Sequence, residues 1–287
     1  MARSELARHA QFEQVSPEVG VLDEEAFEAA MGADPDAALT LLATMASATD
    51  ERLRRAARRL AARIVLDLAR RGIALGRGIG TLHSVPADRG GDLDVDASLD
   101  AVLAGRAQRR PPDVEDLVAR QWARPELALC LVVDRSGSMG GERLAAAALA
   151  AAACAWRAPG DHAVLAFARE VQVLRPMGSD RPVAAVVDSV LSLRGHGTTA
   201  LTAALAAAAE QLERTRAARR VVVLLSDCRT TDTEDPVHVA RRLPELVVLA
   251  PAGDTEQAAD FAARSGARWA PLSGVADAPG ALRELLG

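Results

Sequence analysis

Asp134, Ser136 and Ser138 occupy alternate positions in the segment LALCLVVDRSGSMGG, residues 127–141. An apolar run precedes Asp134, and paired glycines and an alanine-rich stretch follow Ser138. This order predicts a buried strand, then a polar turn, then a helix. Open α/β sheets bind their ligands at the carboxyl ends of the strands. The segment therefore predicts a ligand site that contains one carboxylate and two hydroxyls.

Two later segments bring further oxygen atoms to predicted loops. Thr199 lies in a glycine-containing turn before a predicted helix, and Asp227 directly follows a second apolar strand. Strand-following loops share one edge of a parallel sheet, so we expect Asp134 and Asp227 to converge there. Such an all-oxygen set suits Mg²⁺, Mn²⁺ or Ca²⁺, and suits zinc or copper poorly. The candidate oxygen ligands from these segments are the side chains of Asp134, Ser136, Ser138 and Asp227, with a hydroxyl from Thr198 or Thr199.

Strands alternate with helices from residue 127 onward, which predicts a doubly wound, mostly parallel α/β sheet. Only Arg169 and Glu170 separate two of the strands, and a parallel crossover cannot be that short. That pair is expected to form a hairpin, with one antiparallel strand at the edge of a six-stranded sheet. The predicted strands are 127–133, 163–168, 171–174, 221–226, 246–250 and 268–271, and the predicted helices are 142–156, 182–193, 201–214, 236–243, 255–265 and 277–286.

Residues 1–124 are predicted to form a separate, mainly helical region. Three helices are expected in its first part, the third with acidic residues in its first turn and Gly72 as its stop. Residues 73–91 are interpreted as a loop or a distorted strand, and Asp96 as the cap of a short helix. The expected helices are 23–32, 36–45, 49–72, 97–103 and 113–122.

Composition excludes several classes of function. The 287 residues include no lysine, so the chain has no Walker A loop of its own and no Schiff-base chemistry. A net charge of −5 and an aromatic content of 2% argue against nucleic acid as a partner. Neither a signal peptide nor a membrane-spanning run is visible, and three cysteines form no C-x-x-C pair. We therefore expect a cytoplasmic protein that does not bind membranes.

The three polar segments resemble the metal-ion-dependent adhesion site of von Willebrand factor A (VWA) domains. The D-x-S-x-S motif matches residues 134–138, the threonine motif T-x-L-x-x-A-L matches Thr199 onward, and the later aspartate matches Asp227 in LLSD. Thr198 is the alternative for the threonine. The resemblance covers residues 125–287 and implies a Rossmann-like VWA domain there. It also implies that the serines and the threonine contact the ion, while a partner protein supplies a Glu or Asp carboxylate to it.

The short motif DRSGSMG at residues 134–140, the SDCR turn at Ser226–Arg229 and the absence of a secretion signal resemble intracellular bacterial VWA proteins. Proteins of that type resemble the VWA parts of chelatase subunits or of proteins paired with MoxR-type AAA+ ATPases. The resemblance therefore implies that this chain is an adaptor and is not itself an enzyme. Because residues 1–124 contain no lysine, any ATPase is expected to act in trans. Two alternatives stay open: an adhesion-type VWA protein, which would need export, and a hydrolase with a Ser136–His196–Asp227 relay, although its serine lies in no G-x-S-x-G elbow.

Overall fold

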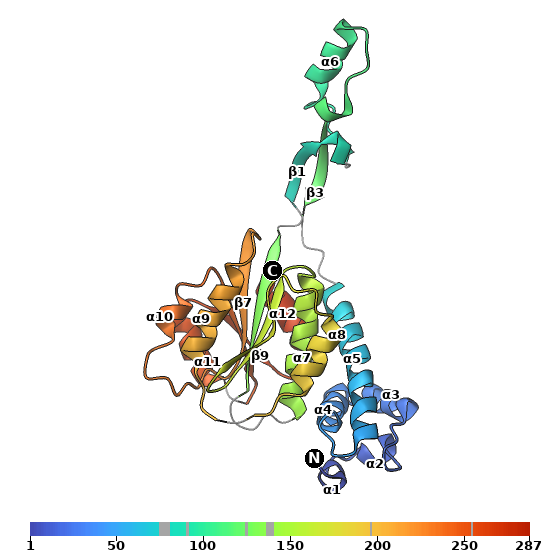
Figure 1. Cartoon of the computed structure of the whole chain (residues 1–287), viewed down its shortest axis with the longest axis vertical. Coiled ribbons are helices and arrows are strands. Elements are labelled where there is room, and N and C mark those ends of the chain that lie inside the picture. The colour runs from blue at the N-terminus through green and yellow to red at the C-terminus, as the bar shows by residue number, and fades with distance from the viewer. Residues whose placement is uncertain (75–80, 90–91, 124–125, 136–140, 196, 254) are drawn as a thin grey trace. The chain divides into compact units, whose positions relative to one another are not determined.

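The structure is a computed structural model that describes residues 1–74, 81–89, 92–123, 126–135, 141–195, 197–253 and 255–287. It divides into two compact units (Figure 1). The large unit consists of residues 1–76 and 127–287, and the small unit of residues 77–126. Among the described residues, no helix is both long and apolar enough to cross a membrane.

A six-stranded sheet forms the centre of the large unit, in the order β6-β5-β4-β7-β8-β9. All neighbours are parallel except β5 and β6, which are antiparallel, so β6 is an antiparallel edge strand. The predicted fold class, six strands and hairpin are confirmed. The strands are β4 (Leu127–Asp134), β5 (His162–Phe167), β6 (Val171–Arg175), β7 (Arg219–Leu225), β8 (Leu246–Pro251) and β9 (Arg268–Leu272).

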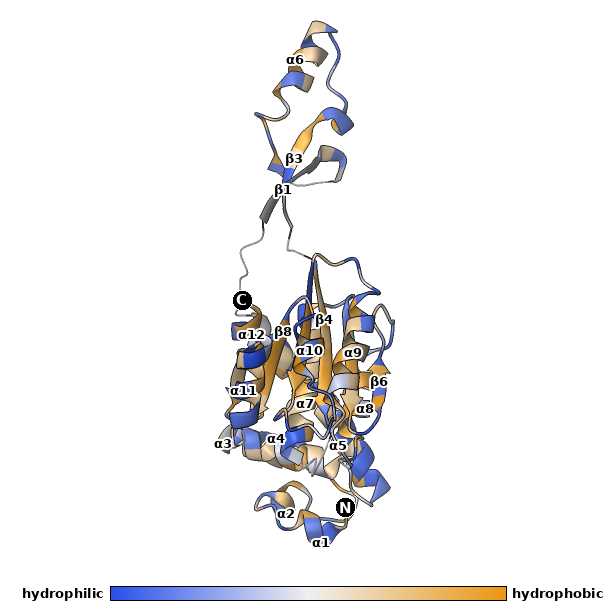
Figure 2. Ribbon diagram, turned by 90° about the vertical axis from the view of Figure 1, so that its left-hand side faces the viewer, coloured by the Kyte–Doolittle hydropathy of each residue, from blue (hydrophilic) through white to orange (hydrophobic). Residues whose placement is uncertain are grey.

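Helices cover both faces of this sheet (Figure 1). Side chains alternate between the faces of a strand. Odd-numbered residues of β4 accordingly belong to a core with α7 and α8, and even-numbered residues to a core with α9 and α11. Figure 2 shows the apolar strands enclosed between these helices. The helices are α7 (Gly141–Arg157), α8 (Val183–Leu191), α9 (Leu201–Leu212), α10 (Val237–Ala240), α11 (Glu256–Ser265) and α12 (Ala278–Leu286).

The N-terminal helices add a further layer outside α7. They are α1 (Arg3–Leu6), α2 (Phe12–Val15), α3 (Glu24–Ala33), α4 (Pro35–Met45) and α5 (Glu51–Ala74), and both α4 and α5 contact α7. Residues 144–155 of α7 are all buried, since the sheet covers one side of the helix and the N-terminal layer another. The alanine-rich sequence of α7 permits this close packing on every face.

The N-terminal helices pack on the sheet domain, so the compact units of the chain do not meet at the predicted boundary between residues 124 and 125. The N-terminal helices share the core of the sheet domain, because the apolar faces of α4 and α5 are buried against α7. The predicted stop at Gly72 is also wrong, since α5 continues to Ala74. A Cβ atom on Gly72 would lie 2.7 Å from Cβ of Pro279, so this glycine allows close packing against α12 instead.

The small unit contains a three-stranded antiparallel sheet in the order β1-β3-β2. A helix was expected over residues 113–122, and that prediction is wrong: a 3₁₀ turn and β3 occupy this segment, because β3 pairs with β1. The helix α6 of the small unit was predicted to start at residue 97. It starts two residues later, with Ser98 at the N-cap. The elements are β1 (Thr81–Pro86), η1 (Ala87–Arg89), β2 (Asp92–Leu93), α6 (Leu99–Ala107), η2 (Val114–Asp116) and β3 (Val118–Ala123).

Candidate metal centre

Asp134 is the last residue of β4 and is almost completely buried, with 8% of its surface exposed. The Ser226 hydroxyl donates a hydrogen bond of 2.6 Å to Oδ2 of Asp134. Ser226 directly follows β7, the neighbour of β4 in the sheet. The same Ser226 oxygen accepts a hydrogen bond of 2.9 Å from the backbone N–H of Cys228. Two adjacent strand ends therefore fix the orientation of the Asp134 carboxylate.

Asp227 and Asp134 line one cavity of about 370 Å³ at the carboxyl edge of the sheet. The backbone N–H of Arg229 donates a hydrogen bond of 3.1 Å to the Asp227 carboxylate. Arg143, in the first turn of α7, lies 3.8 Å from the other oxygen of Asp227. Among the described residues, the cavity is lined by Asp134, Glu142, Arg143, Ala146, Leu225, Ser226, Asp227, Pro251, Ala252, Gly253, Leu272, Gly274 and Val275.

The carboxylates of Asp134 and Asp227 both lie close to the thiol of Cys228. Burial is the main cause that raises the pKa of its thiol, and the negative charges of Asp227 and Asp134 raise it further. Both carboxylates are thus close enough to disfavour a thiolate at the same position. The backbone of Cys228 has a φ of 59°, a left-handed conformation that is uncommon for a residue with a side chain. The turn after β7 therefore contains a left-handed residue directly after Asp227.

Thr199 lies in the turn before α9 and is buried, with 5% of its surface exposed. Its backbone N–H donates a hydrogen bond of 3.0 Å to the Thr231 hydroxyl, and its carbonyl accepts one of 3.1 Å from the Thr231 N–H. Asp232 accepts a hydrogen bond of 2.7 Å from the backbone N–H of Thr202 in the first turn of α9. Because an acidic group at a helix N-terminus is favourable, this loop stabilises both α9 and the position of Thr199.

Backbone hydrogen bonds join the Asp134 and Thr199 segments to the end of the same strand. The N–H of Arg135 donates to the carbonyl of Phe167, and the N–H of Ala200 donates to the carbonyl of Ala168, each at 2.8 Å. Both segments therefore leave the sheet beside the end of β5. The side chain of Thr199, however, is not among the described residues that line the cavity.

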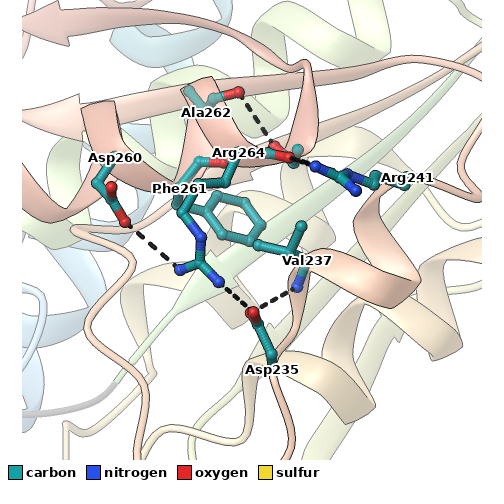
Figure 3. A network of polar contacts seen from close by, with 8 residues as sticks. Asp235, Val237, Arg241, Asp260, Phe261, Ala262 and Arg264 are labelled. Atoms are coloured by element: carbon teal, nitrogen blue, oxygen red, sulfur yellow. Dashed lines mark hydrogen bonds and ion pairs between the residues drawn. The ribbon is translucent and has the colours of Figure 1, made fainter.

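The loop after β7 is held at its far end by an ion-pair network (Figure 3). Arg264 of α11 pairs with Asp235 and lies 3.5 Å from Asp260. Arg241 donates hydrogen bonds of 2.9 and 2.6 Å to the carbonyl of Arg264. Asp235 also accepts a hydrogen bond of 3.1 Å from the N–H of Val237. Although exposed ion pairs stabilise little individually, together they connect this loop to α10 and α11.

Three residues named from the sequence lie outside the described residues. These are Ser136 and Ser138 of the predicted metal site and His196 of the alternative hydrolase relay. Two neighbours of the predicted site were not in the predicted ligand set. Ser226 stands directly before Asp227 in the motif LLSD, and this adjacency indicated that Ser226 would lie near the site. No sequence pattern indicated that Arg143 would reach Asp227.

The donor atoms in this region fit a hard divalent cation. Asp134 and Asp227 offer carboxylate oxygens in one cavity, and the nearby hydroxyl groups offer neutral oxygens. The described residues include no cluster of three or more His, Cys, Asp or Glu side chains that could hold a metal. A cation here would therefore need hydroxyl oxygens or water in addition to the two carboxylates, which suits Mg²⁺ and Mn²⁺ better than zinc.

Comparisons with known proteins found similarities in structure and in sequence. A search of curated proteins found no match. Similar solved structures include manganese-loaded TRAP protein from Plasmodium vivax, with 16% identity, a TM-score of 0.45, and coverage of 57% of this chain and 74% of that one. BatB from Bacteroides thetaiotaomicron has 16% identity, a TM-score of 0.44, and coverage of 56% and 97%. A von Willebrand factor type A structure from Catenulispora acidiphila has 18% identity, a TM-score of 0.44, and coverage of 58% and 43%. Residues 129–231, about a third of the chain, match the sequence model of the von Willebrand factor type A domain.

Proposed function

We propose that this chain is a metal-dependent adaptor that binds a partner protein through a divalent cation. The observation that carries the proposal is the pair Asp134 and Asp227, which come from neighbouring strand ends and line one cavity. Ser226 holds one of these carboxylates in place by a short hydrogen bond. VWA domains are in general protein-interaction modules, which agrees with a binding role for this edge of the sheet.

The proposed ligands of Mg²⁺, or of Mn²⁺ or Ca²⁺, are Asp134, Ser136, Ser138, Thr199 and Asp227. Only two of them are carboxylates, so a bound cation would keep much of its positive charge. When bound, the ion would supply an electrophilic position that accepts a carboxylate oxygen from a Glu or Asp of the partner. The chain's own residues would orient that position, with Ser226 fixing Asp134 and the Thr231 hydrogen bonds fixing the Thr199 turn.

We further propose that the adaptor works in the cytoplasm with a separate AAA+ ATPase of the MoxR or chelatase type. The supporting observation is chemical: these 287 residues contain no lysine, so they cannot supply the Walker A loop that such an ATPase needs. In this role the adaptor would hold a client protein while the ATPase remodels it or assists metal insertion. The chain itself would have no catalytic residue.

Affinity capture from an extract of the source cells tests this function. The full-length chain is immobilised with Mg²⁺ or with EDTA, beside the Asp134→Asn variant. We expect Mg²⁺ to retain an AAA+ ATPase or a metalloenzyme client, and both EDTA and the variant to release it. Identical retention in all three conditions would contradict metal-dependent binding. Hydrolysis of model esters that persists in EDTA would favour the alternative hydrolase instead.

A further inference from the structure

Apolar side chains form much of the wall of the cavity that Asp134 and Asp227 line. They come from α7, from the ends of β7, β8 and β9, and from the segments that follow β8 and β9. Four of the six are at most 8% exposed, so they are core residues at the cavity surface. Pockets that bind ligands commonly combine such a wall with a few polar groups. The apolar lining residues are Ala146, Leu225, Pro251, Ala252, Leu272 and Val275.

Hydrogen bonds hold this wall in place. The N–H of Ala252 donates a hydrogen bond of 3.1 Å to the carbonyl of Leu272, which joins the ends of β8 and β9. Asp36 of α4 accepts a hydrogen bond of 2.8 Å from the N–H of Ala276. A Cβ atom on Gly274 would clash with the same carboxylate, so the segment after β9 packs closely on α4. The wall is therefore formed in advance, which lowers the entropic cost of binding a ligand there.

The charged groups of the cavity control which ligands can enter it. Among the described residues, three carboxylates and one guanidinium line it, from Asp134, Glu142, Asp227 and Arg143. The carboxylates outnumber the guanidinium, so the cavity repels a further carboxylate when no cation is bound. A divalent cation at the proposed site would remove this repulsion. A ligand that carries a carboxylate should therefore bind only together with the cation.

We infer that the apolar wall is a subsite for an aliphatic side chain that stands next to the carboxylate bound to the cation. This inference rests on the proposed function and describes its partner, which is a protein segment with a Glu or Asp beside Leu, Ile or Val. A carboxylate alone would leave the wall in contact with water, whereas an adjacent aliphatic side chain would cover it. The cavity volume of about 370 Å³ lies in the range of ligand pockets, which is about 300–1,000 Å³.

Three matched peptides test the subsite on the full-length chain. One fluorescein-labelled peptide has glutamate between two leucines, the second has glutamate between two serines, and the third has glutamine between two leucines. Fluorescence anisotropy measures each affinity with Mg²⁺ and with EDTA. In Mg²⁺ we expect the leucine–glutamate peptide to bind about tenfold more tightly than the serine–glutamate peptide, since this is the least that burial of a leucine side chain contributes. EDTA, or glutamine in place of glutamate, should abolish the binding.

Two variants change the wall itself. Ala146→Leu fills part of the cavity from α7, and Val275→Thr replaces a methyl group of the wall by a hydroxyl. The readout is the ratio of the leucine–glutamate affinity to the serine–glutamate affinity, because a change in folding or in Mg²⁺ affinity alters both peptides alike. We expect each variant to lower this ratio. Ala206→Leu, at an exposed position of α9, is the matched control and should leave the ratio unchanged.

The outcomes separate this subsite from the proposed function. Mg²⁺-dependent binding with equal affinity for both glutamate peptides would overturn the subsite and leave the proposed function intact. A ratio that neither wall variant changes would also overturn the subsite, because the leucines would then bind elsewhere. Glutamate peptides that bind no better in Mg²⁺ than in EDTA would overturn the proposed function, and the subsite with it.

Discussion

Ser226 donates a hydrogen bond of 2.6 Å to Asp134 across the junction of β7 and β4. Both residues are almost inaccessible to solvent, so the bond forms in a buried environment. It orients one carboxylate oxygen of Asp134 and leaves the hydroxyl oxygen to accept from the N–H of Cys228. Ser226 is therefore a positioning residue for the proposed metal site.

Ser226→Ala removes both of these hydrogen bonds. We expect the free energy of unfolding to fall by about 1–3 kcal/mol, because the buried groups lose their partner. We also expect weaker Mg²⁺ binding, but a smaller loss than removal of the Asp134 carboxylate would cause. Urea denaturation and Mg²⁺ titration measure the two effects. Ser226→Thr, which keeps the hydroxyl, should retain more of the Mg²⁺ affinity than the alanine variant; equal losses would argue against a positioning role.

Arg143 places a positive charge 3.8 Å from the Asp227 carboxylate. A cation that binds Asp227 would be repelled by this guanidinium, so Arg143→Gln should tighten Mg²⁺ binding. Partly exposed charge pairs contribute up to about 1 kcal/mol, which limits the gain to about fivefold. Titration calorimetry at low and high salt checks the effect, which should shrink as salt rises. Arg59→Gln, on α5, serves as the control, and an equal gain there would indicate a general charge effect.

Gly141 begins α7 and lies against α4. A Cβ atom at this position would clash with the Thr44 hydroxyl and would lie 2.5 Å from the carbonyl oxygen of Thr40. Gly141→Ala should therefore destabilise the large unit by roughly 1–3 kcal/mol, since both contacts belong to a packed helix. Gly160→Ala is the matched control because nothing lies within 4 Å of its Cβ position. Thermal unfolding of the two variants compares them, and equal melting temperatures would show that α4 does not pack here.

His162 is buried, and its Nδ1 atom lies 2.9 Å from the carbonyl oxygen of Ala158. Burial lowers its pKa from 6.5 to about 4, and the positive charge of Arg175 contributes to the shift. The unfolded chain then binds a proton more readily than the folded chain. The contribution of His162 to the free energy of unfolding is consequently at its full value above pH 6.5. As the pH falls toward 4, the free energy of unfolding decreases by up to about 3 kcal/mol because of this residue.

His162→Asn tests that pH dependence, because asparagine retains an N–H donor but does not titrate in this range. We expect the difference in unfolding free energy between wild type and variant to change between pH 6.5 and pH 4, and to stay constant above pH 7. A difference that is the same at every pH would show that His162 does not cause the loss.

The sheet domain was predictable because its signals are local. Apolar runs marked all six strands, and the two residues between 168 and 171 required a hairpin, as β5 and β6 confirm. The position of Asp134 and Asp227 at neighbouring strand ends followed from parallel topology. The contacts of Ser226 and Arg143 with these carboxylates depend on side-chain directions, which sequence spacing does not specify.

Predictions failed where contacts between distant segments decide the structure. Residues 113–122 had a helix-like pattern, but pairing with Thr81–Pro86 makes a strand of their second half. The helices α3, α4 and α5 were predicted, whereas α1 and α2 were not. Nothing in the spacing of residues indicated that α4 would pack on α7. Asp36 of α4 accepts a hydrogen bond of 2.8 Å from the N–H of Ala276, 240 residues away. Because of such contacts, the N-terminal helices and the sheet domain form one compact unit, and the second unit consists of residues 77–126.

The most direct test of the proposed metal site is a Mg²⁺ titration of the full-length chain and of its Asp134→Asn variant. Calorimetry measures the Mg²⁺ affinity, and the shift in melting temperature measures the stabilisation by Mg²⁺. Asparagine keeps the shape of the side chain and an oxygen that can accept from Ser226, but removes the negative charge. The account predicts saturable binding and thermal stabilisation by Mg²⁺ in wild type. It predicts that Asp134→Asn loses both while remaining folded. Unchanged Mg²⁺ affinity and unchanged stabilisation in the variant would contradict a metal site at Asp134.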